Sequence, residues 1–371
     1  MNNLKEQIRA YPYQSKRKTY NQVMRIRKMD PLVQLHPNAL PTFISVKSIM
    51  NRVIKSLRPP LPLINSDIRL DSDYTLTLDN KTFLISNENN ELLIFSTHEL
   101  LECLCNADQI LMDGTFFSCP LLFKQLYTIH MINHTIIPCA YILLPNKKKE
   151  TYFKMLDLLK NYCLSIGFLF SPPKALIDFE MGVLRALEEM FPTISVKGCY
   201  FHYCQCILRR IQGNRLAAFS RLNPDFKRFY RRLMAISFLT EMDIPLVLSE
   251  LKSEVEAFNL DPIRDLFTYF KNTWINLNAK FKYKMWNMYD VQGVRTNNHV
   301  EGFHRSLKEY ITYSHPNLYL FIDILKQIQQ DMDIKFIQLR NGKKVTERKK
   351  KYCIIDEKYF YIMLLIHQCS I

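Results

Sequence analysis

The sequence has 371 residues, of which 48% are hydrophobic, and it includes 24 phenylalanines and 20 tyrosines. This composition excludes a disordered chain, because disordered chains lack the apolar side chains that build a core. The formal net charge of +15 indicates a polyanionic partner, either nucleic acid or an anionic membrane surface.

Cysteine usage and apolar runs exclude two further classes. The ten cysteines contain no CxxC pair and the first residues carry no apolar signal segment, so we expect reduced thiols rather than a secreted disulfide framework. No apolar run reaches the roughly 18 residues that span a bilayer. The longest runs, 136–145 and 359–366, suit buried strands or a terminal helix. We expect a cytosolic or nuclear protein with no membrane partner.

Residues 1–60 are basic and predict a helical N-terminal region that is a candidate for DNA binding. Helical patterns occur in "KRKTYNQVMRIRK" and in "SVKSIMNRVIKSL", and the second ends at "RPPLP". Residues 61–105 predict a β-hairpin and a connecting segment, because Asp79-Asn80 separates two β-rich runs.

Residues 106–205 predict the first part of an α/β core. The expected strands are "QILMDGTF", "KQLYTIHMI", "TIIPCAYILL", "KALIDF" and "TISVKGCYF", and the helices are "KKETYFKMLDLLKNYCLSI" and "EMGVLRALEEMF". Three consecutive strands followed by alternating helices and strands is the order of a mixed five-stranded sheet of the ribonuclease H type, with flanking helices.

Residues 206–290 predict an α-helical insertion. In "PDFKRFYRRLMAISF" the apolar residues share one helix face, and the basic residues, which either contact DNA or are solvated, share the other. Trp274 and Trp286 suit core packing better than base stacking. Similarly, His130 and His134 suit packing and turn roles better than metal ligation.

The last two regions complete the expected organisation. Residues 291–335 predict the last helices of the core, and residues 336–371 form a basic tail with an apolar end. The charge run 341–353 is either a nuclear localisation signal, which would place the protein in the nucleus, or a solvated linker.

Two acidic residues stand where strands enter the core. Asp113 lies near the end of the first core strand and Asp178 near the end of the fourth, and these strands are neighbours in the expected sheet. Two close carboxylates repel each other unless a cation neutralises them, and Mg²⁺ or Mn²⁺ prefers such oxygen ligands. A two-metal site with ions roughly 4 Å apart would support attack on a phosphodiester. Glu301 is the candidate third acid, with Glu180 and Glu309 as alternatives.

Each acid also has a structural explanation. Asp113 could accept turn hydrogen bonds beside Gly114, and Asp178 could cap a helix that starts at Phe179. Glu301 could form a capping box with Asn298, which precedes it by three residues.

The ordered motifs decide between these explanations. The segments "DGTF" (113–116), "LFKQLYTIH" (122–130), "PCAYILLPNKKKETY" (138–152), "IDFEMGVLRALEEMFP" (177–192), "GCYFHYCQ" (198–205) and "TNNHVEGFHRSLK" (296–308) together resemble the catalytic core of animal Mutator-like element (MULE) transposases. The resemblance implies a ribonuclease-H-like fold that an α-helical insertion interrupts between the second and third acids. It also implies a DDE triad of Asp113, Asp178 and Glu301 that binds divalent metal and cuts and rejoins DNA at element ends.

The family also carries a C-x-x-H pair, which Cys199 and His202 match. These residues could supply half of a zinc site, completed by Cys204, Cys206, His299 or His304. We favour the alternative, in which they support the acids without binding zinc.

The implied partners are double-stranded DNA, as terminal repeats and as target, and further copies of the chain. Near the acids, Arg295, Arg305 and Lys308 could meet a phosphate, although solvation explains them equally. The other candidate DNA-binding residues lie in or before the insertion: Arg209, Arg210, Lys227, Arg228, Arg231 and Arg232.

One departure from the family suggests a different function. Many animal relatives carry a FLYWCH-type zinc finger ahead of the catalytic part, whereas the first 95 residues here contain no cysteine, so we expect this finger to be absent. Recognition of element ends would fall to the basic N-terminal helices or to another chain. The alternative function is a domesticated or decayed transposase that binds DNA or chromatin without catalysis.

Overall fold

A computed structural model describes residues 2–10, 16–36, 38, 40–57, 59–132, 136–291, 293–311 and 314–341. His134, the charge run after Asn341 and the apolar segment 359–366 lie outside these residues. Within the part of the chain that is described, no helix combines the length and the hydrophobicity needed to cross a bilayer.

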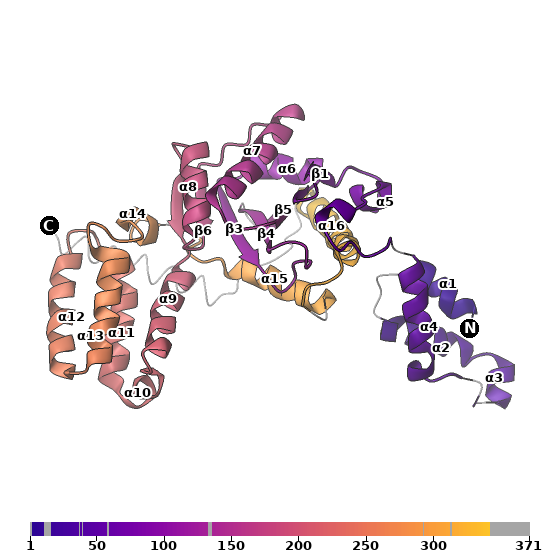
Figure 1. Cartoon of the computed structure of the whole chain (residues 1–371), viewed down its shortest axis with the longest axis horizontal. Helices are drawn as coiled ribbons and strands as arrows, with labels where there is room; N and C mark the ends of the chain where they lie inside the picture. Colours follow the sequence, from indigo (N-terminus) through magenta and orange to yellow (C-terminus); the bar gives the residue numbers. More distant parts are fainter. Residues whose placement is uncertain are drawn as a thin grey trace.

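A mixed seven-stranded β-sheet forms the centre of the molecule, with the strand order β1-β2-β5-β4-β3-β6-β7 (Figure 1). Strands β3, β4 and β5 pair antiparallel, and β6 lies parallel to both β3 and β7. The strands are β1 (Leu84–Glu88), β2 (Leu92–Phe95), β3 (Gln109–Thr115), β4 (Gln125–Ile132), β5 (Ile136–Leu144), β6 (Lys174–Ile177) and β7 (Ser195–Gly198). The α/β class is therefore confirmed.

The sheet is larger than the sequence patterns predict. The five expected core strands are β3 to β7, and the hairpin of β1 and β2 extends them because β2 pairs antiparallel with β5. The expected turn at Asp79-Asn80 is flanked by one isolated bridge between Leu76 and Thr82. The regular hairpin instead turns between β1 and β2 at Asn89 and Asn90, whose φ angles of 50° and 59° asparagine tolerates better than most residues.

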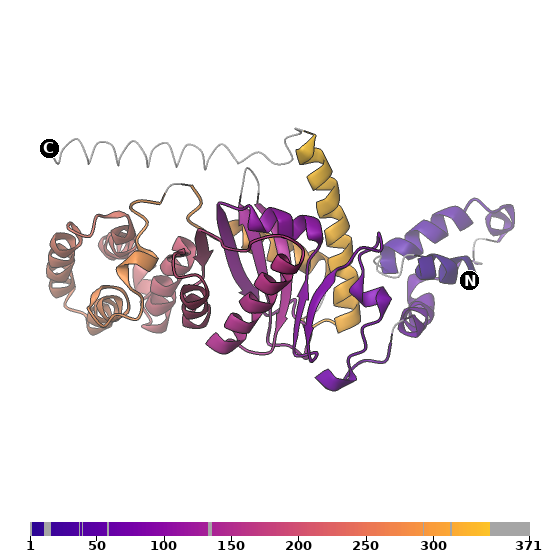
Figure 2. The ribbon, with the colours of Figure 1, turned by 90° about the horizontal axis from the view of Figure 1, so that it is seen from above.

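Helices cover both faces of the sheet (Figure 2). In β2, for example, Leu92 and Ile94 pack into the core on the side of α7, whereas Leu93 and Phe95 pack on the side of α16. The helices on the first side are α6 (His98–Cys105), α7 (Lys149–Ser165) and α8 (Met181–Met190), and those on the second are α5 (Ser72–Thr75), α15 (Asn298–Tyr310) and α16 (Leu318–Arg340). Because both faces are covered, a polar side chain on a central strand needs a specific reason to be there.

A helical arm leaves the sheet after β7. Its helices are α9 (Tyr200–Gly213), α10 (Ala217–Leu222), α11 (Pro224–Ala235), α12 (Ile244–Phe258), α13 (Asp261–Phe270) and α14 (Tyr283–Trp286). The amphipathic pattern of α11 is confirmed, because Phe226, Phe229 and Leu233 are buried. Core packing of the tryptophans is also confirmed, since each is 1% exposed and the Trp286 Nε1 donates to the Trp274 carbonyl over 2.9 Å.

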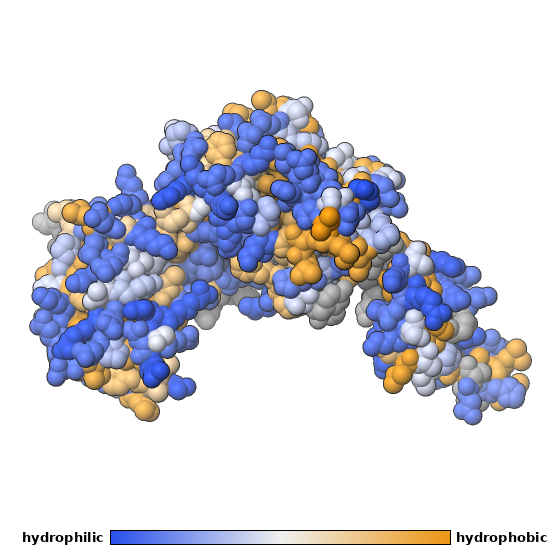
Figure 3. Space-filling view, viewed as in Figure 1, coloured by the Kyte–Doolittle hydropathy of each residue, from blue (hydrophilic) through white to orange (hydrophobic). Residues whose placement is uncertain are grey.

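A separate bundle of helices precedes the sheet. It contains α1 (Asn2–Ala10), α2 (Lys16–Arg27), α3 (Pro31–Leu35) and α4 (Phe43–Ser56). Its own small core includes Leu4, Ile8, Val23, Met50 and Val53. The bundle and the α9–α14 arm lie at opposite ends of the sheet and project to the same side of it (Figures 1 and 3).

Candidate metal centre

Asp113 is a buried acid on the central strand β3. Side chains alternate along a strand, so Ile110 and Met112 enter the core on the side of α6 to α8, while Leu111 packs with Val300 of α15 on the other side. Asp113 shares the face of Leu111 and is 7% exposed. The alternation of β3 therefore aims a carboxylate at the start of α15.

Asp178 reaches the same place because β6 is parallel to β3. The register pairs Ile110 with Ala175 and Leu111 with Leu176, and its continuation brings Asp178, just beyond β6, level with Asp113. The Asp178 Oδ1 accepts a hydrogen bond from the backbone N–H of Phe179 over 2.6 Å. The two aspartates thus converge at one edge of the sheet, as the sequence predicts.

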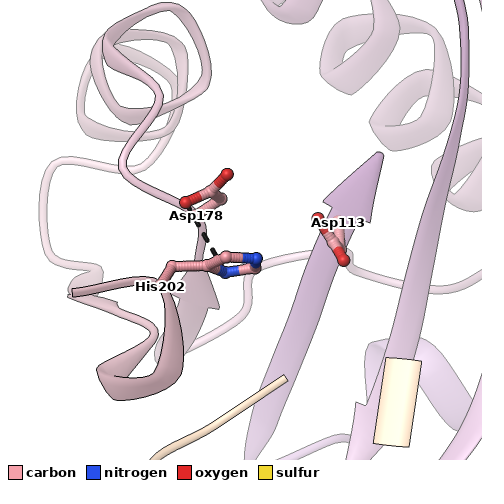
Figure 4. Close-up of side chains that lie close together, drawn as sticks. All are labelled: Asp113, Asp178 and His202. Carbon is pink, nitrogen blue, oxygen red and sulfur yellow. Dashed lines mark ion pairs between the residues drawn. The ribbon is translucent and has the colours of Figure 1, made fainter. Parts of the chain in front are cut away.

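His202 and Glu301 complete the cluster from the first turns of α9 and α15. The His202 Nδ1 lies 3.5 Å from the Asp178 Oδ1, and its Nε2 lies 3.4 Å from the Glu301 Oε1. Figure 4 shows the imidazole between the carboxylates of Asp178 and Asp113. Ligand atoms of Asp113, Asp178 and His202 all lie within 4.8 Å of one another. Two aspartates and one histidine therefore share a single small volume, and Glu301 contacts the histidine of this group.

The start of α15 is pinned to the rest of the site by Asn297. Its backbone N–H donates to the Cys199 Sγ over 3.2 Å, and its side-chain Nδ2 donates to the Met112 carbonyl over 3.2 Å. The N–H of Tyr200 donates to the Arg295 carbonyl over 2.9 Å. These bonds join β3, α9 and α15 at the level of the acids, so Glu301 is placed by the fold rather than by local chain preference.

Within the described residues, the ion-pair contacts of the three acids are made by histidines, and no lysine or arginine forms an ion pair with them. Burial and the charge of Asp178, together with that of Glu301, raise the pKa of Asp113 to about 7. The Nδ1 of His202 is buried, and no hydrogen bond from the described residues reaches it. Carboxylate oxygens with one imidazole suit Mn²⁺ or Mg²⁺, so the donor set fits a divalent cation that would relieve the repulsion.

A chain of buried polar groups lies behind Asp113. The His304 Nδ1 lies 3.7 Å from the Asp113 Oδ2, and its Nε2 lies 3.0 Å from the Thr128 Oγ1. The His130 Nε2 lies 3.1 Å from the same hydroxyl. Burial lowers the pKa of His304 to about 4 and also lowers that of His130, so both imidazoles are neutral at pH 7. His130 is thus a buried packing residue, as predicted.

Of the structural explanations proposed for the three acids, only the one for Asp113 holds in part, and it accounts for one of its two oxygens. Asp113 lies within β3 and not in a turn, but its Oδ1 accepts one hydrogen bond from the Gly114 N–H over 2.9 Å, which leaves Oδ2 to face His304. The capping role for Asp178 is wrong, because α8 begins at Met181 and has Glu180 as its N-cap. The capping box at Glu301 is also wrong, because the N-cap of α15 is Asn297 and no side-chain cap forms.

The alternative third acids lie in other surroundings. The Glu180 carboxylate accepts hydrogen bonds from the Lys147 Nζ over 2.8 Å and from the Tyr152 hydroxyl over 2.6 Å. Glu309 lines a cavity between α15 and α16. Among the described residues, Glu301 is the one of these three acids with an ion-pair contact to His202.

The zinc alternative has no support in the described part of the chain. Cys199 is fully buried and its sulfur accepts the Asn297 N–H, and no cysteine belongs to a group of three or more potential metal ligands there. His202 is directed to the acids instead.

The candidate DNA-binding residues are scattered, and several are engaged within the fold. Arg232 on α11 forms ion pairs with Glu250 and Glu254 of α12. Arg228 pairs with Asp225 over 3.1 Å. Other positions are as follows: Arg209 donates to Gln205, Arg210 lies over the Tyr269 ring, Arg295 donates to the Val291 carbonyl, Lys308 lies over the Phe117 ring, and Lys227, Arg231 and Arg305 are exposed.

Two residues of the site are not evident from residue type and spacing. Asn297 belongs to "TNNHVEGF", in which Glu301, four residues later, is the residue type expected to bind metal. Thr128 lies opposite Asp113 on β4, and only the strand register reveals this pairing. An alternating polar pattern of Thr128 and His130 in an otherwise apolar strand is the signal that could have found it.

Part of the chain is similar to a known protein family. No curated protein matches the chain. The family model of the MULE transposase domain matches residues 109–206. The match runs from β3 into α9 and includes Asp113, Asp178 and His202, but ends before Glu301. Residues 109–206 are therefore similar to a MULE transposase domain, which supports the family expected from the motifs.

Proposed function

We propose that the protein is a MULE-type DDE transposase core that cuts DNA phosphodiesters and transfers strands at element ends. The observation that carries this proposal is the meeting of Asp113, Asp178, His202 and Glu301 at one sheet edge. Their carboxylates come from three separate elements and, within the described residues, form no ion pair with a lysine or arginine, which is expected for a metal site.

The topology supports the ribonuclease-H-like part of the proposal. The order β5-β4-β3-β6-β7, with three antiparallel strands followed by two parallel ones, is the arrangement expected for that sheet. The helices α9 to α14 lie in sequence between the second and third acids, as the insertion should. We propose the same division of the chain as the sequence predicts: N-terminal helices (1–60), hairpin and connecting segment (61–105), first part of the core (106–205), insertion (206–290), last core helices (291–335) and tail (336–371).

Asp113, Asp178 and Glu301 would hold Mg²⁺ or Mn²⁺, and His202 would orient Asp178 and Glu301 or add a nitrogen ligand. When bound, the ions would activate a water or hydroxyl nucleophile and stabilise the leaving oxygen. The residues themselves fix the positions of the ligands: the Gly114 and Phe179 N–H groups orient the two aspartates, and Asn297 holds the first turn of α15. We also propose duplex DNA as substrate, a homo-oligomer on DNA and a nuclear location.

The test is Mn²⁺-dependent nicking of supercoiled duplex DNA by the full chain, compared with Asp113→Asn, Asp178→Asn and Glu301→Gln. We expect nicking by the wild type and its loss in all three variants. If the wild type binds DNA but does not nick it in Mn²⁺ or Mg²⁺, catalysis is refuted and the chain is a DNA-binding derivative of a transposase.

A further inference from the structure

We propose that α2 is a DNA-reading helix whose exposed face is defined by Lys18, Asn21, Gln22, Arg25 and Lys28, the last one residue past the helix end. This deepens the proposed function and rests on it for the class of partner, duplex DNA. It adds a second DNA contact, far from the acids, and assigns to it the choice of sequence.

The charge of the chain is concentrated at this end. Residues 2–57 contain eleven lysines and arginines against two acidic residues, a net charge of +9 out of +15 for the whole chain. The bundle α1 to α4 is also a folded unit with its own apolar core. So much positive charge on so small a unit raises its attraction to polyanions and is a typical electrostatic footprint of nucleic-acid binding.

The face of α2 that points away from the bundle is polar and basic. Thr19, Val23 and Met24 are buried against α1 and α4. At 100° per residue, the five residues of the reading face fall on the opposite side of the helix, and all five are exposed. No ion pair within the described residues joins Lys18, Arg25 or Lys28 to a carboxylate, so their charges are available to a partner.

The neighbouring basic residues hold α2 in place instead. The Arg17 guanidinium lies 4.7 Å from the centroid of the Phe43 ring, and the Lys16 Nζ donates to the Asn51 Oδ1 over 2.6 Å. Both partners belong to α4. The first turn of α2 is therefore fixed to the bundle, and the reading face is presented by a supported helix.

The side-chain types on this face suit the major groove. An α-helix fits into that groove, where Arg and Lys bind guanine and Asn and Gln bind adenine. Ile26 and Met29 border the face and are 65% and 76% exposed, which suits contact with thymine methyl groups. The mixture of amides with basic residues favours base reading over a purely electrostatic grip.

A membrane surface fits the same helix less well. An interfacial helix buries its apolar face in the lipid. The apolar face of α2 is already buried in the bundle core through Val23 and Met24. Binding to anionic lipid is therefore the competing outcome that the experiment must exclude.

The experiment uses the full chain with Asp113→Asn, so that no cutting interferes. A library of random-sequence DNA duplexes is selected for binding, and the enriched sequence and a scrambled duplex are then titrated by fluorescence anisotropy at several salt concentrations. Phosphatidylserine-containing vesicles form a parallel arm. Three double variants are compared: Arg25→Ala with Lys28→Ala, Asn21→Ala with Gln22→Ala, and, as the matched control, Arg52→Ala with Lys55→Ala on the exposed surface of α4.

We expect an enriched sequence whose affinity falls roughly tenfold or more in the Arg25/Lys28 variant, with a salt slope reduced by about 2, and by less in the α4 control. The Asn21/Gln22 variant should lose preference for the enriched sequence while keeping affinity for the scrambled duplex. The proposal is overturned if the α2 and α4 variants lose DNA affinity equally. It is also overturned if the Asn21/Gln22 variant keeps its preference for the enriched sequence, or if the chain binds vesicles more tightly than DNA.

The two proposals fail separately. If the Asp113→Asn chain selects a DNA sequence through α2 but the wild-type chain does not nick DNA, the catalytic function is refuted and the reading helix stands. If the wild-type chain nicks DNA but substitutions on α2 do not change DNA binding, the reading helix is refuted and the catalytic function stands. Each α2 and α4 variant changes only exposed side chains, so we expect the bundle to remain folded. A melting curve of each variant checks this.

Discussion

The acid cluster and the α11–α12 contact handle charge in opposite ways. At the sheet edge, Asp113, Asp178 and Glu301 hold like charges close together, and the pKa of Asp113 rises to about 7. Between α11 and α12, Arg232 meets Glu250 and Glu254, so opposite charges pair. The second arrangement stabilises the fold, whereas the first costs stability.

This difference separates charges that hold the protein together from charges that face a partner. Neighbours in the fold neutralise structural charges. A cluster left unbalanced in the fold indicates that something outside the chain balances it. The same distinction applies to basic residues: Arg228 and Arg232 of the insertion are paired, whereas Lys18 and Arg25 of α2 have no carboxylate partner within the described residues.

The largest effect is expected for DNA nicking. Asp113→Asn, Asp178→Asn and Glu301→Gln should each lower the Mn²⁺-dependent rate by roughly 100- to 1,000-fold, the cost of losing one preorganised electrostatic group. Glu309→Gln removes an exposed acid two turns further along α15 and is the matched control. Comparable losses in Glu309→Gln would show that charge in general, and not this cluster, supports nicking.

The next effect is expected in metal affinity. Asn297→Ala removes the bond to the Met112 carbonyl and should weaken Mn²⁺ binding by roughly 10- to 100-fold, as is typical when support for metal ligands is lost. Asn298→Ala changes the neighbouring exposed residue and should leave binding unaltered. Calorimetric titration with Mn²⁺ measures both, and equal affinities in the two variants would contradict the role of Asn297.

A smaller effect is expected in stability: Asp113→Asn, which lowers nicking, should raise the free energy of unfolding. Because the folded pKa of Asp113 is about 7 and its ordinary value is 3.8, the folded state binds more protons between these pH values. The metal-free wild type should therefore lose stability as the pH rises from about 4 to 7, and Asp113→Asn should be more stable by about 2 kcal/mol at pH 8. Urea unfolding at pH 5 and pH 8 tests this; a variant less stable than the wild type at pH 8 refutes it.

The smallest effect concerns the paired charges. Arg232→Ala leaves two glutamates of α12 without their cation and should lower the free energy of unfolding by about 1 kcal/mol. Arg231→Ala, at the adjacent exposed position, should change it by less. Nicking should survive in both variants. A loss of nicking in Arg232→Ala without a loss of stability would mean that this arginine faces a partner after all.

The sequence predicts the parts of this molecule that depend on local pattern. The apolar runs of β3 to β7 identify the core strands, and the apolar face of α11 identifies a packed helix. Parallel pairing of β3 with β6 makes the meeting of Asp113 and Asp178 predictable once the sheet order is assumed.

The remaining features depend on contacts between distant residues. β2 pairs with β5, and no local pattern in either strand predicts that the two are partners. Arg232 is indistinguishable from Arg231 in the sequence, because only the packing of α12 supplies its glutamates. The same holds for Asn297, whose two partners lie 98 and 185 residues away.

The most direct test of the metal centre is Mn²⁺ calorimetry of the wild type and of Asp113→Asn at pH 7, in two buffers with different ionisation enthalpies. We expect the wild type to bind Mn²⁺ and to release about half a proton at this site, because a carboxyl with a pKa of about 7 is half protonated before the metal arrives. Asp113→Asn should bind more weakly and release no such proton. Equal binding and equal proton release in the two proteins would contradict a metal centre built on Asp113.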